Sequence, residues 1–275
     1  MRFLASIAIG LLIIGAPARL LASGPHAPMP RGSLFLYWGY NRSGYGTSDI
    51  HFNGPGYDFT LHRVKAVDRA VAFEAKTYFS PATMWVPQYN YRLGWFITDR
   101  FSLSLGLDHM KYFLVTGQEA RMTGSIDPTR SEQYAGDDID QMVVLAPDLV
   151  QYEHSDGLNL LSVDLDRYDR IWSGTLGRIM VHAFEGVHVG PVIPRSDVRL
   201  FGEGVNNRFH LAGFGLGVQA GVHVTILRYV FLRVTGRAGW IDLPNVLTTG
   251  TSEDRAHQNF LFYQGSAELG AQFRF

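Results

Sequence analysis

The end of this chain alternates between apolar and polar residues and finishes on an aromatic residue. The apolar positions are Ala267, Leu269, Ala271, Phe273 and Phe275. The positions between them are Ser266, Glu268, Gly270, Gln272 and Arg274. Because successive side chains of a β-strand point to opposite faces, such a strand has one apolar face and one polar face. This pattern is typical of bacterial outer-membrane β-barrels, whose lipid-facing residues alternate with residues that point into the interior.

The start of the chain predicts export. Arg2 precedes an apolar run from Phe3 to Ile14, and the small residues around Ala16 and Ala18 fit a signal-peptidase site. The run is shorter than the roughly 20 residues that a membrane-spanning helix needs, which disfavours a transmembrane anchor. We therefore expect residues 1–22 to be a cleaved signal peptide and residues 23–275 to form an outer-membrane barrel.

The composition excludes several classes of protein. The chain contains no cysteine, so an exported form has neither a disulfide framework nor a lipid-bearing N-terminal cysteine. The net charge of -1 argues against a nucleic-acid partner, which would require a basic surface. Aromatic residues make up 13% of the chain and mean hydropathy is close to zero, as expected when lipid-facing and interior residues alternate. We expect no cofactor and no bound metal.

The alternation recurs upstream in two pairs of strands joined by tight turns. One hairpin runs over residues 88–108 and turns at residues 98–100, and another runs over residues 210–241 and turns at residues 227–229. A soluble lipocalin-like barrel or a periplasmic sandwich would also alternate, but its exposed face should be charged. Here the face opposite the polar residues carries Tyr89 and Trp95, about 20 Å apart along the strand, which fits two aromatic girdles.

The remaining strands are expected at residues 32–41, 57–64, 158–166 and 171–184, with a doubtful one near residues 70–78. The sequence therefore predicts an antiparallel up-and-down transmembrane barrel of ten strands, or of eight if residues 57–64 and 70–78 are left out. Both numbers are even, as in single-chain bacterial barrels. The long segments without strand signal are predicted extracellular loops, at residues 42–56, 117–157, 186–207 and 244–258. The longest of them is 117–157.

Charged residues fall on the face predicted to point into the barrel. These residues are Arg92, Asp108, Asp164, His223, Arg233, Arg237, Glu268 and Arg274. A barrel of eight or ten strands is too narrow for a wide aqueous channel, so one interpretation is an ion-pair network that fills the interior. The other interpretation is a narrow, porin-like conduit lined by arginine.

Histidines raise the question of catalysis. His51, Asp58 and His62 lie close together in sequence, and the hydroxyls of Ser48 and Thr60 are nearby. A general base must lie within hydrogen-bond reach of its nucleophile, and these residue types could supply both. His51, Asp58 and His62 are therefore the catalytic candidates. The alternative is that most of these histidines occupy loop or girdle positions. The acidic run at residues 136–140 lacks the spacing of a calcium loop and is interpreted as a solvated loop.

Several segments resemble a known group of proteins. They are residues 36–42, 48–52, 56–60, 87–92 and 108–112, together with the terminal strand. In these segments the chain resembles a family of bacterial outer-membrane β-barrel proteins of uncharacterised activity. The resemblance covers mainly residues 34–112. It implies the barrel fold and brings no catalytic residues to carry over.

These observations predict a small outer-membrane barrel with a structural, surface-binding or narrow-pore role. The alternatives are a lipid-modifying enzyme of the acylase, deacylase or phospholipase type, and an adhesin that binds through the loop at residues 117–157. Expected partners are outer-membrane lipids, lipopolysaccharide and the barrel-assembly machinery, for which Phe273 and Phe275 would form the C-terminal signal. The solute or surface ligand is left open.

Overall fold

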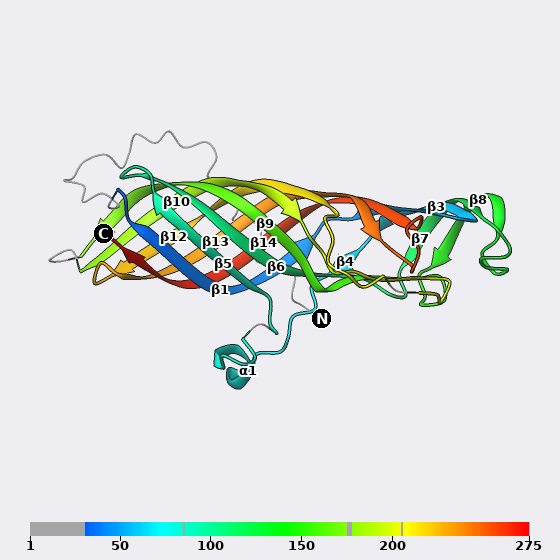
Figure 1. The fold of residues 1–275 in the computed structure, drawn as a ribbon, viewed down its shortest axis with the longest axis horizontal. Helices are drawn as coiled ribbons and strands as arrows, with labels where there is room; N and C mark the ends of the chain where they lie inside the picture. Colours follow the sequence, from blue (N-terminus) through cyan, green and yellow to red (C-terminus); the bar gives the residue numbers. More distant parts are fainter. Residues whose placement is uncertain (1–30, 85, 175–177, 205, 275) are drawn as a thin grey trace, which may run out of the picture.

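The computed structural model of the protein describes residues 31–84, 86–174, 178–204 and 206–274. The predicted signal peptide and Phe275 lie outside the described residues. The elements, shown in Figure 1, are β1 (Leu34–Tyr45), β2 (Ser48–Gly54), β3 (Tyr57–Val64), β4 (Ala66–Val67), α1 (Ala75–Phe79), β5 (Tyr89–Phe96), β6 (Phe101–Leu114), β7 (Glu119–Ile126), β8 (Gly136–Val144), β9 (Val150–Ser173), β10 (Ile179–Val192), β11 (Asp197–Leu200), β12 (Gly213–Ile226), β13 (Val230–Leu247) and β14 (Arg255–Phe273).

Eight strands close into a barrel. Its order around the ring is β1, β5, β6, β9, β10, β12, β13 and β14, each strand antiparallel to its neighbours. The ring closes between β1 and β14, which pair from Leu34 opposite Phe273 to Tyr45 opposite Phe262. Closure leaves no unpaired edge in the wall, which is the condition for a sheet to span a membrane.

The ring has eight strands, so the choice of ten was wrong. Residues 57–64 do form a strand, β3, but it pairs with β2 and β7 outside the ring. Residues 70–78 contain irregular chain and the start of α1. Alternation identifies a strand locally, whereas membership of the ring depends on which distant strand it pairs with.

The two ends of the barrel differ. At the end that holds the last residues of β14, β12 turns into β13 within three residues, 227–229, of which Leu227 and Arg228 have the positive φ angles, 52° and 72°, that tight hairpin turns require. At the other end the connections are long and contain β2, β3, β4, β7, β8, β11 and α1. Short periplasmic turns and long extracellular connections are characteristic of outer-membrane barrels, so we expect the long connections at the outer end, and we refer to that end of the barrel by this name.

An apolar band surrounds the barrel wall. Its exposed members include Leu36, Leu93, Trp95, Leu105, Val163, Val189, Leu216, Val218, Leu232, Val234, Leu261 and Leu269. Towards the outer end the same faces become polar, at Arg42 on β1, Lys111 on β6, Asp242 on β13 and His257 on β14. Since only apolar side chains are stable against lipid tails, these polar positions mark the outer boundary of the membrane. None of the helices in the described ranges is long and apolar enough to cross a membrane.

Beyond this boundary the sheet continues as a folded extension. The first residues of β14 pair with β2, and β3, β7 and β8 follow in order, while β11 adds to β9 and β4 adds to β6 (Figure 1). We call β2, β3, β7, β8, β11 and the adjoining outer ends of the wall strands the outer extension. Its inner faces form a core that includes Phe52, Phe59, Leu61, Met110, Met122, Leu149, Tyr152, Leu158, Val198 and Val246.

The segment at residues 117–157 is therefore not a strandless loop. It contains β7, β8 and the first residues of β9. The segments at 42–56, 186–207 and 244–258 likewise contain strand residues of β1 and β2, of β10 and β11, and of β13 and β14. Sequence analysis missed β7 and β8 because Gly124, Asp137 and Asp138 are poor strand formers, which tertiary pairing overrides here.

Candidate functional site

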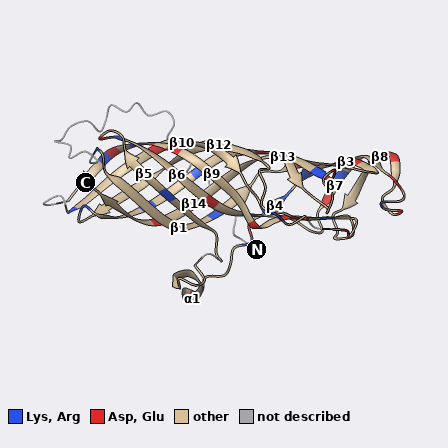
Figure 2. Cartoon of the chain, viewed as in Figure 1, with Lys and Arg blue, Asp and Glu red and all other residues tan. Residues whose placement is uncertain are grey.

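The centre of the barrel holds a cluster of buried charges. Arg92 on β5 lies 2.5 Å from Asp108 Oδ2 and 2.7 Å from Asp164 Oδ2. Arg237 on β13 contacts the same two oxygens, at 2.6 Å and 2.9 Å. No side chain of these four is more than 1% exposed. Two arginines thus share two aspartates in a compact group inside the barrel. Figure 2 marks the charged positions along the strands.

A second set of contacts lies next to this group. Arg233 on β13 donates to Asp166 Oδ2 at 3.0 Å and to the Tyr168 hydroxyl at 2.5 Å, and its guanidinium lies 3.6 Å from the ring centroid of Phe184. Asn90 on β5 donates to Glu268 on β14 at 2.9 Å. Each buried charge therefore has charged or polar partners, which offset the cost of removing it from water.

The interior is filled above and below these charges as well. Towards the periplasmic end lies a cluster of aromatic side chains, formed by Phe35, Tyr37, Phe96, Tyr168, Phe184 and Phe231. Towards the outer end lies the apolar core of the outer extension. Side chains thus fill the interior of the barrel at three successive levels along its axis: the aromatic cluster, the charge cluster and the apolar core.

All of the predicted interior residues except Arg274 point into the barrel. His223 is among them, but it packs on Phe231, with ring centroids 4.3 Å apart, and lies 3.1 Å from Thr225 Oγ1. Arg274 follows the last residue of β14 and is exposed, so it lies outside the cluster. Alternation could not reveal that the strand ends one residue earlier.

Sequence reasoning left out Asp166, Gln219 and Tyr168 from the interior set. Gln219 donates to Asp164 at 3.4 Å and also contacts Asp166. The signal was present, because Asp166 and Tyr168 continue the period-two face of Asp164. What the sequence lacked was the closure of the ring, inside which these β9 residues meet the arginines of β13.

The three catalytic candidates do not form one cluster. His51 Nε2 lies 2.8 Å from Asp58 Oδ1, and this hydrogen bond lowers the pKa of the Asp58 carboxyl. His62 instead lies 3.1 Å from Asp49 Oδ2 through Nδ1 and 2.7 Å from Thr123 Oγ1 through Nε2. Ser48 points to the opposite, buried face and accepts a hydrogen bond from Gln258 at 2.8 Å. His62 thus lies between a carboxylate, Asp49, and a hydroxyl, Thr123, within hydrogen-bond distance of both. Sequence spacing did not indicate either of these partners.

A row of polar residues crosses the exposed face of the outer extension. The residues of this row are paired with one another from strand to strand. They are His257 on β14, His51 on β2, Thr60 on β3, Thr123 on β7 and Asp140 on β8. Several of these groups are paired, such as His257 with Asp242 at 3.2 Å and Arg121 with Asp140 at 2.7 Å. Over the ranges that the structure covers, no group of three or more His, Asp or Glu side chains is arranged to hold a metal ion.

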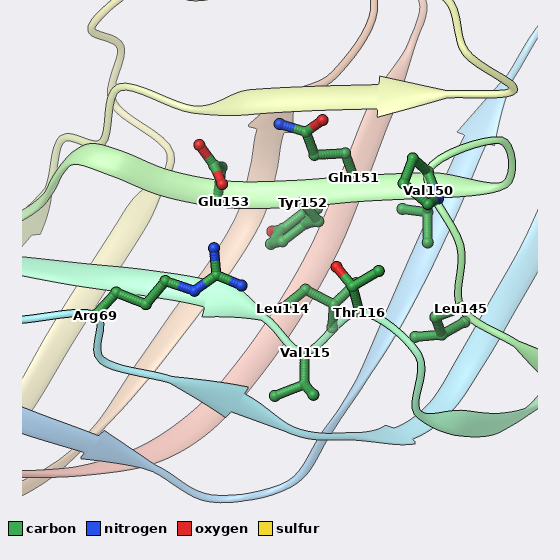
Figure 3. Close-up of a pocket in the computed structure, with 10 residues that line it drawn as sticks. Arg69, Leu114, Val115, Thr116, Leu145, Val150, Gln151, Tyr152 and Glu153 are labelled. Atoms are coloured by element: carbon green, nitrogen blue, oxygen red, sulfur yellow. The ribbon is translucent and has the colours of Figure 1, made fainter.

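A pocket of about 250 Å³ opens in the side of the outer extension (Figure 3). It lies where the ladder between β6 and β9 separates, just beyond the pair of Phe113 and Glu153. Leu114 and Val115 line one wall, and Gln151 and Tyr152 line the other. Its volume is slightly below that of typical small-ligand sites.

A closed eight-strand barrel with an apolar outer band and a polar interior is the architecture of bacterial outer-membrane proteins. The chain has the fold of a small bacterial outer-membrane β-barrel. No family model and no curated protein sequence matches the chain. Similar solved structures include the outer membrane protein OprG from Pseudomonas aeruginosa, with 9% identity, a TM-score of 0.41 and coverage of 90% of this chain and 99% of that chain.

Two further structures show comparable similarity. Neisserial surface protein A has 13% identity and a TM-score of 0.37, covering 88% of this chain and 97% of that one. The outer membrane protein AlkL has 10% identity and a TM-score of 0.37, covering 92% and 95%. At this level of identity the likeness concerns the fold alone.

Proposed function

We propose that this protein is a non-conducting outer-membrane barrel that holds a folded β-structure outside the cell as a binding surface. The observation that carries the proposal is the buried cluster of Arg92, Asp108, Asp164 and Arg237. It connects strands from opposite sides of the ring and thereby occupies the barrel axis.

A conducting role would require these ion pairs to separate. Breaking a buried ion pair leaves uncompensated charges and costs about 3–5 kcal/mol. An open state of that energy would be populated at well under one part in a hundred, since each 1.4 kcal/mol is a factor of ten. The aromatic cluster adds a second barrier on the periplasmic side. These features favour a closed lumen over a porin-like conduit.

The outer extension fits the role of a binding platform. Its apolar core makes it a folded structure with a fixed outer face. That face presents imidazole, carboxylate, amide and hydroxyl groups in register across five strands. Polar side chains on a rigid scaffold are the usual basis of recognition at an exposed surface. We infer that the partner is a macromolecule outside the cell.

Single-channel conductance in a planar bilayer tests the closed lumen. The refolded protein without residues 1–22 should give no discrete current steps. As a positive control, a bacterial porin reconstituted in the same bilayer should give such steps. Steps from the unmodified protein at comparable frequency would overturn the proposal.

Surface binding is tested with the protein embedded in nanodiscs. The probes are immobilised extracellular-matrix proteins and sulfated polysaccharides. His51→Ala with Asp58→Ala should weaken binding of any probe that the protein captures, because both residues lie on the exposed face. Leu93→Ala, on the lipid-facing band, is the matched control and should leave binding unchanged. Equal binding by all three proteins would show that the outer face is not the binding surface.

A second candidate function is acyl transfer on the same face. Asp49, His62 and Thr123 have the order of an orienting acid, a general base and a nucleophile, within hydrogen-bond distances. The Thr123 hydroxyl would lose its proton to His62 Nε2 as its oxygen attacks an ester carbonyl. The C–O bond of the ester would then break, and His62 would return the proton to the departing alcohol oxygen. An activated acetyl ester should then acetylate Thr123, as detected by mass spectrometry, and His62→Ala should abolish the modification. Acetylation of Thr123 at the same rate in His62→Ala would reject this site.

A further inference from the structure

The connection between β4 and β5 forms an arm that leaves the barrel wall sideways. It spans residues 68–88 and contains the short helix α1. Figure 1 shows α1 standing clear of the barrel, part-way along its length, whereas β7 and β8 lie at the far outer end. We call residues 68–84 and 86–88 the lateral arm. It differs from the other long connections, which fold into the outer extension.

The lateral arm is fixed to the barrel at the outer boundary of the membrane. The Tyr78 ring packs on Tyr40, with ring centroids 4.6 Å apart, and its hydroxyl lies 2.6 Å from an Arg42 guanidinium nitrogen. Lys111 Nζ donates to the carbonyl oxygen of Val86 at 3.2 Å. Arg42 and Lys111 are the first charged residues above the lipid-facing band on β1 and β6. The arm therefore leaves the wall at the level where lipid tails meet head groups.

Three apolar side chains of the lateral arm are uncovered, beside the exposed Glu74 and Lys76. Phe73 and Phe79 are each 72% exposed, and Val86 is 50% exposed. The two phenylalanine rings lie together, with centroids 6.3 Å apart, and Phe73 also contacts Tyr78. Two adjoining phenylalanines at this exposure are costly in water.

We propose that the lateral arm is a membrane anchor whose Phe73 and Phe79 side chains insert among the acyl chains of the outer leaflet. The occupant is lipid because the apolar side of the arm continues the established lipid-facing surface, through the Tyr78–Tyr40 contact onto Trp38, whose ring lies 4.5 Å from that of Tyr40. Lys76, between the two phenylalanines in sequence, can extend its ammonium group to the lipid phosphates, as lysines at membrane interfaces do. The arm thus sets the depth and rotation of the barrel in its membrane.

The absence of cysteine permits a direct test. The variant Phe79→Cys is labelled with the fluorophore NBD and reconstituted into phosphatidylcholine nanodiscs. Its emission should be quenched by lipids that carry a doxyl group on the acyl chain and resist quenching by iodide in the water. The matched control is Met142→Cys on β8, which is 63% exposed on the outer extension. The label at position 142 should be quenched by iodide and should resist quenching by the doxyl lipids. A label at position 79 that iodide quenches as fully as at 142, or that neither agent quenches, would overturn the proposal.

A measurement without a label removes the contribution of the fluorophore itself. Trypsin can cleave after Lys76, which lies in α1 between the two phenylalanines. In nanodiscs, Phe73→Ser with Phe79→Ser should speed this cleavage by about tenfold or more, since burying one phenylalanine changes a population ratio by at least that factor. Leu211→Ser with Val144→Ser, two exposed apolar positions away from the arm, should leave the rate at Lys76 unchanged. Equal cleavage in all three proteins would contradict insertion of the arm.

Discussion

Arg237 on β13 and Asp108 on β6 form an ion pair of 2.6 Å between strands that lie opposite each other in the ring. Replacing Arg237 with alanine would leave Asp108 and Asp164 to share Arg92 alone. Because both carboxylates are buried, we expect the variant to lose about 3–5 kcal/mol of stability. The measurement is the free energy of unfolding in urea, with the protein in lipid vesicles.

The matched control for this prediction is Arg121→Ala. Arg121 forms a two-pronged ion pair with Asp140, but both side chains are more than half exposed. Solvent-exposed pairs contribute at most about 1 kcal/mol. If Arg237→Ala proves as mild as Arg121→Ala, the interior cluster contributes little to stability.

Gly106 on β6 provides space for the Arg92 side chain. A Cβ atom at this position would overlap Cδ of Arg92 and the carbonyl oxygen of Tyr91. Gly106→Ala should therefore displace Arg92 from its two aspartates and destabilise the barrel by about 1–3 kcal/mol. Gly265 on β14 is the control, because a Cβ there would meet no atom within 4 Å. Equal unfolding midpoints for Gly106→Ala and Gly265→Ala would contradict this account.

His154 makes the outer extension sensitive to acid. Burial between the rings of Tyr112 and Tyr152 lowers the pKa of His154 from 6.5 to about 3, and its Nδ1 lies 2.8 Å from Ser196 Oγ. The unfolded chain thus binds a proton at His154 between these pH values and the folded chain does not. Stability is complete above pH 6.5 and falls by up to about 1.4 kcal/mol for each pH unit below it.

The test is thermal unfolding followed by the near-ultraviolet circular dichroism of the tyrosines. Lowering the pH from about 7 to about 5 should lower the midpoint in the unmodified protein more than in His154→Gln, which cannot take up the proton. His257→Gln, at an exposed position, should retain the full pH dependence. The same pH dependence in His154→Gln would assign the effect to other groups.

Tyr57 ties β3 to the connection between β13 and β14. Its hydroxyl donates to Asp254 Oδ1 at 2.7 Å, across 197 positions of sequence. Burial raises the pKa of Asp254, but hydrogen bonds from Thr249, Tyr57 and Thr251 outweigh this and hold it below its usual value. Tyr57→Phe should cost about 1–3 kcal/mol because a buried acceptor loses a donor. Faster trypsin cleavage after Arg255 would report the loosened connection, and Tyr263→Phe on the lipid face should not change it.

The barrel class could be predicted from the sequence, because alternation along β5, β6, β12, β13 and β14 is a local property. The same alternation places Arg92, Arg233 and Arg237 on one side of their strands. It could not give the number of strands in the ring, since β3 alternates as clearly as a wall strand. Pairing partners far apart in the chain decide whether a strand belongs to the wall or to the outer extension.

The polar face of the outer extension was harder to predict. Sequence proximity grouped His51, Asp58 and His62, and the hairpin of β2 and β3 does bring His51 to Asp58. His62 instead contacts Thr123, a residue of β7 that lies 61 positions away. The lateral arm gave a misleading strand signal, because Phe73, Tyr78 and Phe79 are residues typical of strands that serve here in an irregular segment.

The position of β14 has a consequence for assembly. This strand pairs with β13 along its length, with β1 over most of the wall, and with β2 through Arg255–Gln258. Neither the ring nor the sheet of β2, β3, β7 and β8 has its full set of neighbours until β14 is in place. Since both depend on the same late strand, barrel closure and formation of the outer extension should occur together, and an interruption of β14 should leave neither complete.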